Sequence, residues 1–176
     1  MEKQHYFLGL GSNIEPEKYI PKIIAALFEW SARVDVSKVY WTAPENLDSQ
    51  RHFLNAAVRI ESELEQAELK QKLVAIEEDL GRDRSDPDKK IKDRTADIDI
   101  LFGLSIQIQQ LKNSQLPKEE YIRRPLIELL HYLNYEIGKT KKYPEKSGVE
   151  LKIKDWSVGT KEVSLQRHAT EAVDAF

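Results

Sequence analysis

The sequence predicts an α+β protein with a ferredoxin-like βαββαβ core, an antiparallel sheet with helices on one face, and a C-terminal helix and hairpin extension. Apolar runs of strand length alternate with segments whose apolar residues repeat at helical spacing, in the order of that fold. The chain has 176 residues, about the length of one domain, without an internal repeat or low-complexity linker. We expect a single domain at 1–176, with a core at about 5–133 and the extension at about 134–176.

The composition excludes several kinds of function. Because the net charge is −3, the chain has no general attraction to nucleic acid or to an anionic membrane. It contains no cysteine, which rules out disulfides, a thiolate nucleophile and a cysteine zinc site. No run approaches the ~20 apolar residues that span a bilayer, and the N-terminus lacks the apolar core of a signal peptide. We expect a cytoplasmic monomer that binds small molecules, with neither nucleic acid nor a membrane as a partner.

The first three elements follow from short local patterns. Residues 6–10 form an apolar run that is closed by turn residues, as expected for a strand. Apolar residues repeat at helical spacing over 20–28, and either Pro16 or Pro21 fits the first turn of this helix. The segment 34–41 is β-branched and aromatic, which predicts the second strand.

The next three elements complete the predicted core. After a polar loop at 43–52, two sets of side chains alternate over 53–60, which predicts a third strand with two distinct faces. A second amphipathic helix is expected at 69–80, with Gly81 in the position of a C-terminal cap. A highly charged segment then leads to the fourth strand within DRTADIDILFG, residues 93–103.

The pattern is weaker beyond the fourth strand. A short helix is expected at 125–133. The segments 149–156 and 161–168 alternate well enough to form the two arms of a hairpin, with its turn at 157–160.

Alternation along the strands predicts which side chains share a sheet face. In the third strand the apolar set must face the helices, which leaves Phe53 and Asn55 on the opposite face. The same reasoning places Asp97 and Asp99 on that face, about 6 to 7 Å apart. Two carboxylates at this spacing suit a pair of hard cations, and magnesium fits better than calcium when phosphates complete its shell. The alternative is a solvated acidic face on an edge strand.

Three arginines surround the acidic pair in sequence. Arg82 and Arg84 follow the second helix, and Arg94 precedes Asp97 by three residues. Guanidinium groups suit phosphate oxygens, so with the aspartates they indicate a polyphosphate site. Alternatively, Arg82 and Arg84 only stabilise a helix C-terminus. The chain has no Gly-x-x-x-x-Gly-Lys-Ser/Thr loop, so side chains and magnesium would have to hold any nucleotide.

Four motifs resemble the 6-hydroxymethyl-7,8-dihydropterin pyrophosphokinase family and occur in the order found in that family. They cover roughly residues 5–103 and are LGLGSN at 8–13, YWTAP at 40–44, FLNAAV at 53–58, and IEEDLGRDR through RTADIDILFG at 76–84 and 94–103. The last motif is the most specific, because the family pattern is Arg-Thr-x-Asp-Leu/Ile-Asp-Ile/Leu.

The resemblance implies an enzyme of folate biosynthesis that moves pyrophosphate from ATP to 6-hydroxymethyl-7,8-dihydropterin, giving the pterin diphosphate and AMP. By the same resemblance, two Mg²⁺ ions are bound by Asp97 and Asp99, which act in catalysis together with Arg82 and Arg94. The implied nucleotide-binding residues are Glu77, Arg82, Arg84, Arg94, Ile100 and Lys118. The implied pterin-binding residues are Thr42, Phe53, Asn55 and Tyr121.

The chain also departs from the family pattern. Ile91 stands where the family has tryptophan, Lys118 stands where histidine is usual, and the segment 116–125 is shortened. Arg123 or Arg124 is the candidate for a further arginine that contacts phosphate. Two other functions therefore stay open: a paralogue that uses the same Mg-ATP site on another acceptor, and a non-catalytic nucleotide-binding module.

Overall fold

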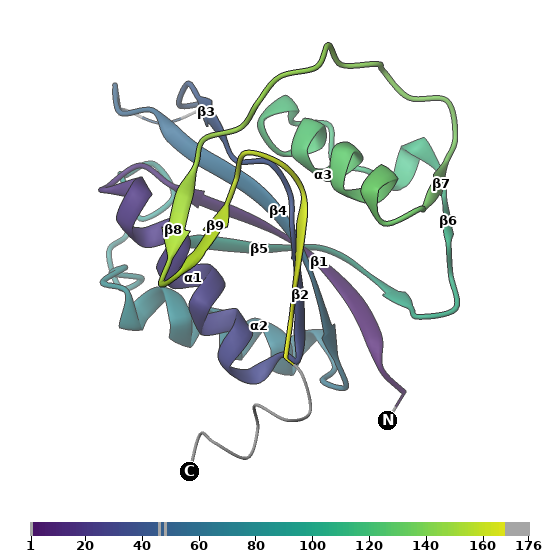
Figure 1. Cartoon of the computed structure of the whole chain (residues 1–176). Coiled ribbons are helices and arrows are strands. Elements are labelled where there is room, and N and C mark those ends of the chain that lie inside the picture. The colour runs from purple at the N-terminus through teal and green to yellow at the C-terminus, as the bar shows by residue number, and fades with distance from the viewer. Residues whose placement is uncertain (1, 46, 48, 168–176) are drawn as a thin grey trace.

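The computed structural model describes residues 2–45, 47 and 49–167, and consists of one large sheet between helices on its two faces (Figure 1). The core elements are β1 (Gln4–Ser12), α1 (Pro16–Trp30), β2 (Arg33–Val36), β3 (Tyr40–Thr42), β4 (Phe53–Ser62), α2 (Gln66–Asp79) and β5 (Asp97–Ser105). The remaining elements are β6 (Gln110–Leu111), a 3-10 turn (Asn113–Gln115), α3 (Glu120–Tyr132), β7 (Glu136–Ile137), β8 (Leu151–Ile153), β9 (Trp156–Val158) and β10 (Val163–Gln166).

The strand order confirms the ferredoxin-like prediction. The sheet runs β10-β2-β4-β1-β5 with every neighbouring pair antiparallel, and the short β3 also pairs with β4. Helices α1 and α2 cover one face, and α3 covers part of the other (Figure 1). Helix α1 begins at Pro16, so Pro21 lies inside it.

The predicted division of the strand faces is also confirmed. The even-numbered side chains of β1 and β4 pack with α1 and α2 in the main core, where Leu54, Val58 and Ile60 have no exposed surface. On the other face, Phe7 and Ala57 pack against Leu126 and other apolar residues of α3. Because α3 covers only the part of this face around Phe7 and Ala57, the part near the N-terminal end of β5 stays open for a site.

The segment expected as one strand at 34–41 is two strands with an irregular joint. Val36 pairs with Val58 and Tyr40 pairs with Asn55, so the β2–β3 side contains one residue more than β4 between these pairs. Ser37 satisfies the backbone of β4 at this irregularity. Its N–H donates to the carbonyl of Ala57 at 2.9 Å, and its hydroxyl accepts from the N–H of Ala57 at 2.8 Å. The result is a β-bulge, which a β-branched run does not reveal.

The prediction of a C-terminal hairpin with arms at 149–156 and 161–168 is wrong in its pairing and its turn. Strand β8 pairs with β9 through a tight turn in which Lys154 has φ of 52°, whereas β10 leaves them and pairs with β2. Gly159 has φ of 100°, and a Cβ there would clash with the Val149 carbonyl oxygen. This glycine turns the chain toward the main sheet, where Leu165 is buried. His168, at the end of the second expected arm, lies outside the described residues.

The helix expected at 125–133 begins five residues earlier, at Glu120, and runs through Pro125. Proline is most often found in the first helical turn, which is why the sequence suggested a later start. None of the helices within the described part of the chain is long and apolar enough to cross a membrane.

A buried ionic cluster joins β10 to the sheet. Asp35 is 1% exposed and accepts hydrogen bonds from Arg59 at 2.8 Å, from Arg33 at 2.9 Å and from the hydroxyl of Ser164. Arg59 is itself only 6% exposed. Removing the carboxylate would leave the guanidinium of Arg59 buried without compensation.

We predict that Asp35→Ala lowers the free energy of unfolding by about 3–5 kcal/mol, because the charge of Arg59 stays buried and unpaired. Urea unfolding followed by circular dichroism measures this change. Lys152→Ala is the control, because Lys152 and its partner Glu150, 3.0 Å away, are both solvent-exposed. Equal stability losses in the two variants would contradict the prediction.

Candidate active site

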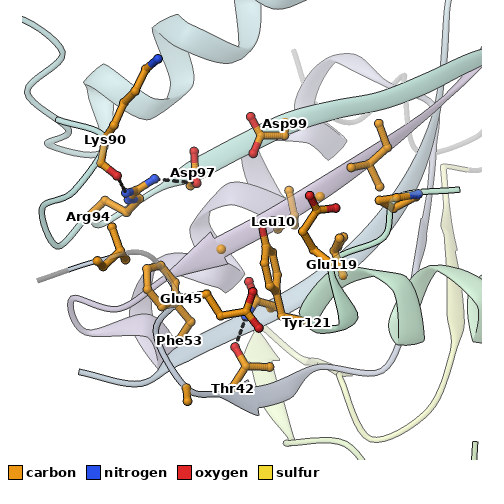
Figure 2. A pocket seen from close by; sticks show the side chains of 18 residues that line it. Leu10, Thr42, Glu45, Phe53, Lys90, Arg94, Asp97, Asp99, Glu119 and Tyr121 are labelled. Carbon is orange, nitrogen blue, oxygen red and sulfur yellow. Dashed lines mark hydrogen bonds and ion pairs between the residues drawn. The ribbon is translucent and has the colours of Figure 1, made fainter. Parts of the chain in front are cut away.

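A cavity of about 450 Å³ opens on the sheet face that α3 leaves uncovered. Figure 2 shows side chains from the strands, the loops and the start of α3 pointing into this space. Seven of the twelve residues predicted for the site line it: Thr42, Phe53, Asn55, Arg94, Asp97, Asp99 and Tyr121. These residues come from β3, β4, β5, the loop before β5 and α3, so the fold gathers parts of the chain that are far apart in sequence.

Two glycines of β1 form part of the cavity lining. Gly9 pairs with Asp99 and Gly11 pairs with Asp97, so both lie between the aspartates and β4. A Cβ on Gly9 would come within 3.2 Å of the Ile122 side chain, and one on Gly11 within 3.1 Å of Asn55 Oδ1. The glycines of the LGLGSN motif therefore keep space beside the acidic pair, in addition to any role in the turn.

Asp97 is held by two arginines in the free protein. Arg82 Nη1 donates to Asp97 Oδ1 at 2.6 Å, and Arg94 Nη1 donates to Oδ2 at 3.0 Å. The side chains of Arg82 and Arg94 are 9% and 11% exposed, so these ion pairs are largely removed from solvent. The negative charge of Asp97, which the sequence left without a partner, is thus neutralised by protein groups.

Asp99 is in a different electrostatic state. It makes no ion pair with any residue that the structure describes. Desolvation by the surrounding protein raises its pKa, and the neighbouring charge of Asp97 raises the pKa further. The positive charges of Lys70, Arg82 and Arg94 oppose this shift. Unlike Asp97, Asp99 has no positive partner among the described residues, and a bound cation would favour its charged form.

Glu77 lies beneath the arginines with no exposed surface. Its carboxylate accepts the backbone N–H of Ile98 at 2.7 Å and the guanidinium of Arg82 at 3.1 Å, and it also pairs with Arg84. Burial raises the pKa of Glu77, while the Ile98 N–H and the two arginines lower it. The structure places this residue as a support for the arginines and for β5, and its predicted nucleotide contact stays a prediction.

The opposite wall of the cavity combines an aromatic ring with an amide. Asn55 is 5% exposed, and its Nδ2 donates to the hydroxyl of Thr42, which lies on the adjacent strand β3. The ring of Phe53 lies beside Arg94, with the guanidinium carbon 6.0 Å from the ring centroid. Tyr121, in the first turn of α3, faces the same space (Figure 2). This wall suits a flat ring with polar edges.

Some predicted residues lie away from the cavity. Five of the twelve do not line it: Glu77, Arg82 and Arg84 form an ion-pair group next to Asp97, Ile100 packs against the main core, and Lys118 is exposed. Arg123 donates to the Pro117 carbonyl at 2.7 Å, and Arg124 donates to the Pro144 carbonyl at 2.6 Å. Neither arginine lines the cavity.

Several lining residues were not identified from the sequence. They include Glu45 and Lys90 in the two charged loops, Glu119 before α3, and Leu101 in β5. The pairing of β1 with β5 shifts between Phe7 and Leu8, and Leu101 lies at this irregularity. Alternation of side chains could have found Gly9, Gly11 and Leu101, whereas no local pattern marks Glu45, Lys90 or Glu119.

The acidic pair limits how a metal could bind. Within the described residues, no group of three or more His, Cys, Asp and Glu side chains is placed to hold an ion. A cation here would take Asp97 and Asp99 from the protein and its other ligands from substrate or water. Magnesium accepts such a ligand set, because it commonly binds one or two carboxylates together with phosphate oxygens.

The ferredoxin-like fold and this cavity define a class of protein: an α+β protein with an acidic pair, adjoining guanidinium groups and an aromatic pocket. Comparison with known families then shows to which family within this class the chain belongs. The family model described as 7,8-dihydro-6-hydroxymethylpterin-pyrophosphokinase matches residues 7–131. The chain belongs to this family, and it is a pyrophosphokinase.

Curated relatives agree with the family assignment. The chain is 31% identical over 158 residues to the 2-amino-4-hydroxy-6-hydroxymethyldihydropteridine pyrophosphokinase of Bacillus subtilis (strain 168), covering 82% of this chain and 93% of the relative. It is 32% identical over 139 residues to the protein of the same name from Porphyromonas gingivalis, covering 74% and 93%. It also matches the folate synthesis bifunctional protein, mitochondrial, of Arabidopsis thaliana, at 36% identity over 53% of this chain and 17% of that protein.

We predict that Asp99→Asn raises the free energy of unfolding at pH 7 by roughly 0.5 kcal/mol, a small effect because the residue is exposed and solvent screens its charge although the nearby protein partly desolvates it. Since the folded protein raises the pKa of Asp99, its ionisation costs stability as pH rises through that pKa. The gain of the variant should therefore shrink as pH falls and vanish by about pH 3, where the wild-type carboxyl is neutral both folded and unfolded. Urea unfolding of the variant and the wild-type protein, without magnesium, at pH 7 and at the low pH measures this difference in stability.

The matched control for this experiment is Asp97→Asn, which removes the charge that Arg82 and Arg94 share. This variant should lose about 1–3 kcal/mol at pH 7, because two guanidinium groups lose a charged partner. If Asp99→Asn proves as destabilising as Asp97→Asn, the conclusion that only Asp97 is stabilised by arginines is wrong.

Proposed function

We propose that the protein transfers pyrophosphate from ATP to 6-hydroxymethyl-7,8-dihydropterin with magnesium, giving the pterin diphosphate and AMP for folate biosynthesis. The observation that carries this proposal is the convergence of Arg82, Arg94 and Asp97 beside a pocket built from Phe53 and Asn55. The family match and the names of the curated relatives support the pterin as the acceptor.

The arginines and aspartates provide the nucleotide side of the reaction. Arg82 lies outside the cavity lining and donates to Asp97 Oδ1 at 2.6 Å, so it would contact a phosphate only after its side chain moves from Asp97. Arg94 lies at the cavity wall, where its guanidinium can orient phosphate oxygens as well as Asp97. Two magnesium ions held by Asp97 and Asp99 would neutralise charge on the phosphates. We therefore assign these four residues to binding and orientation of the transferred group.

The reaction is an in-line displacement at phosphorus. The hydroxymethyl oxygen of the pterin forms a bond to the β-phosphorus of ATP and loses its proton, while the bond from that phosphorus to the α–β bridging oxygen breaks and AMP leaves. Arg82 and Arg94 stabilise negative charge on the phosphoryl oxygens during this step. The protein contributes chiefly by holding the two substrates in line.

The wall formed by β3, β4 and α3 provides the acceptor side. Asn55 Nδ2 is bound to Thr42, which fixes the amide plane and leaves Oδ1 to accept a hydrogen bond from the pterin edge. Phe53 and Tyr121 supply aromatic surface for the flat ring. The loops at 43–52 and 83–93 are proposed to close over the bound substrates and exclude water.

The two other functions predict different outcomes in one assay. A paralogue with another acceptor would bind magnesium ATP but not the pterin, and Ile91 in place of tryptophan is the departure that favours it. A non-catalytic module would bind ligands and release no AMP. That the enzyme acts as a monomer in the cytoplasm, without nucleic acid or membrane partners, stays a prediction.

The assay incubates the protein with ATP, magnesium and the pterin, and detects products by mass spectrometry. We expect equimolar pterin diphosphate and AMP, with loss of both on chelation by EDTA and recovery when magnesium is restored. Asp97→Asn and Asp99→Asn should each lower kcat by about 10²-fold or more, since each removes a carboxylate that would hold the magnesium ions, and those ions would neutralise the phosphates. Formation of ADP and a pterin monophosphate would overturn the proposed reaction.

We predict that Gly11→Ala raises the KM for the pterin about tenfold and leaves the KM for ATP within about twofold, a selective loss of about 1.4 kcal/mol. The added Cβ would lie 3.1 Å from Asn55 Oδ1, so the amide must move from its bonded position. Steady-state kinetics with each substrate varied in turn measure the effect. Gly138→Ala is the control, because the nearest atom to its Cβ would be 3.8 Å away. Equal changes in both KM values would contradict this assignment.

A further inference from the structure

Arg124 is enclosed by groups from three parts of the chain on the outer side of α3. Its guanidinium carbon lies 4.8 Å from the ring centroid of Tyr40 and 5.2 Å from that of Tyr143. Nε donates to Glu128 Oε1 at 2.9 Å, and Nη2 donates to the Pro144 carbonyl at 2.6 Å. We call these five residues, Tyr40, Arg124, Glu128, Tyr143 and Pro144, the Arg124 clamp.

The clamp connects the two elements that form the acceptor wall. Tyr40 lies on β3 two residues before Thr42, and its hydroxyl donates to Glu128 Oε2 at 2.6 Å. Arg124 and Glu128 lie on α3, whose first turn carries Tyr121. The side-chain bonds of the clamp therefore span from the strand that holds Thr42 to the helix that holds Tyr121.

A segment without regular structure completes the clamp from outside. Residues 139–148, which we call the strap, pass over α3 between β7 and β8 (Figure 1). The strap is attached at the start of α3, where the hydroxyl of Tyr143 donates to Glu120 at 2.9 Å. It is attached at β3 as well, where the hydroxyl of Tyr40 lies 3.3 Å from the Lys146 carbonyl oxygen.

The hydrogen bonds and cation–π contacts of the clamp persist at neutral pH. Burial raises the pKa of Tyr40, with a further rise from its bond to Glu128, and burial raises the pKa of Tyr143 to about 12. Both phenols therefore stay protonated and keep donating to carboxylates. A guanidinium between two aromatic rings adds a cation–π attraction of roughly 0.5–2 kcal/mol for each ring. Lysine cannot reproduce the planar fork that also reaches Glu128 and Pro144.

We propose that Arg124 is a positioning residue for the acceptor, which fixes the separation between Thr42 on β3 and Tyr121 on α3. Arg124 does not line the cavity, so it acts through those two residues and not by touching a substrate. Its effect on the pterin rests on the proposed function, whereas its effect on the geometry of the wall does not. A displacement of about 1 Å in a substrate-binding group can lower a rate by about 10²-fold.

Arg124→Met tests this role, because methionine keeps an apolar stem between the rings but has neither the charge nor the donors. We expect the KM for the pterin to rise about tenfold, while the KM for ATP changes by less than about twofold. Arg124→Lys should recover part of the pterin affinity, because the ammonium retains the cation–π contacts and one donor.

The matched control is Arg33→Met. Arg33 also donates through Nε to a carboxylate, Asp35, at 2.9 Å, but it lies on β2 away from the cavity. Both methionine variants lose one arginine–carboxylate pair and should lose some stability. Only Arg124→Met should change the KM for the pterin, which separates positioning from a general loss of stability.

A second measurement does not depend on turnover. Amide hydrogen exchange, followed by mass spectrometry, should become about tenfold faster or more at 40–42 and 119–124 in Arg124→Met and stay unchanged there in Arg33→Met. Unchanged exchange in both segments, or equal increases in the two KM values, would overturn the inference. If the wild-type protein makes no pterin diphosphate yet exchange changes as expected, the proposed acceptor is wrong and the positioning role of Arg124 stands.

Discussion

The candidate site depends on one buried carboxylate. Glu77, on α2, binds the backbone N–H of Ile98 in β5 and the guanidinium groups of Arg82 and Arg84. A buried carboxylate is stable only with such partners, so its position ties the end of α2 to the strand that carries the two aspartates. Because Arg82 also binds Asp97, which lines the cavity, the same contacts hold a positive group next to this carboxylate before any substrate arrives.

The two aspartates are chemically unequal although they are only two residues apart. Asp97 is neutralised by arginines, while desolvation and the charge of Asp97 raise the pKa of Asp99. An incoming cation would therefore relieve an unfavourable charge at Asp99 and would compete with Arg94 at Asp97. The free site is in this sense prepared for a ligand that brings positive charge together with phosphate oxygens.

The wall formed by β3, β4 and α3 is held in another way, by packing and hydrogen bonds. Gly11 leaves space beside Asn55, and Asn55 is held by Thr42 on the next strand. The Arg124 clamp links β3 to α3 outside the cavity. If the proposed positioning role holds, residues outside the cavity set its width, and the strap at 139–148 takes part through its contacts with Tyr40 and Arg124.

Alternation and spacing in the sequence were enough to determine the βαββαβ order and the shared face of Phe53, Asn55, Asp97 and Asp99, because strand geometry is a local property of the backbone. They did not determine the bulge at Ser37 or the pairing of β10 with β2, because both depend on partners distant in the chain. The positions of Ile100, Lys118 and Arg124 relative to the cavity were likewise decided only by tertiary packing. The local sequence pattern predicts the direction in which a side chain points from its own strand or helix. Which residues that side chain contacts depends on the packing of segments distant in the chain.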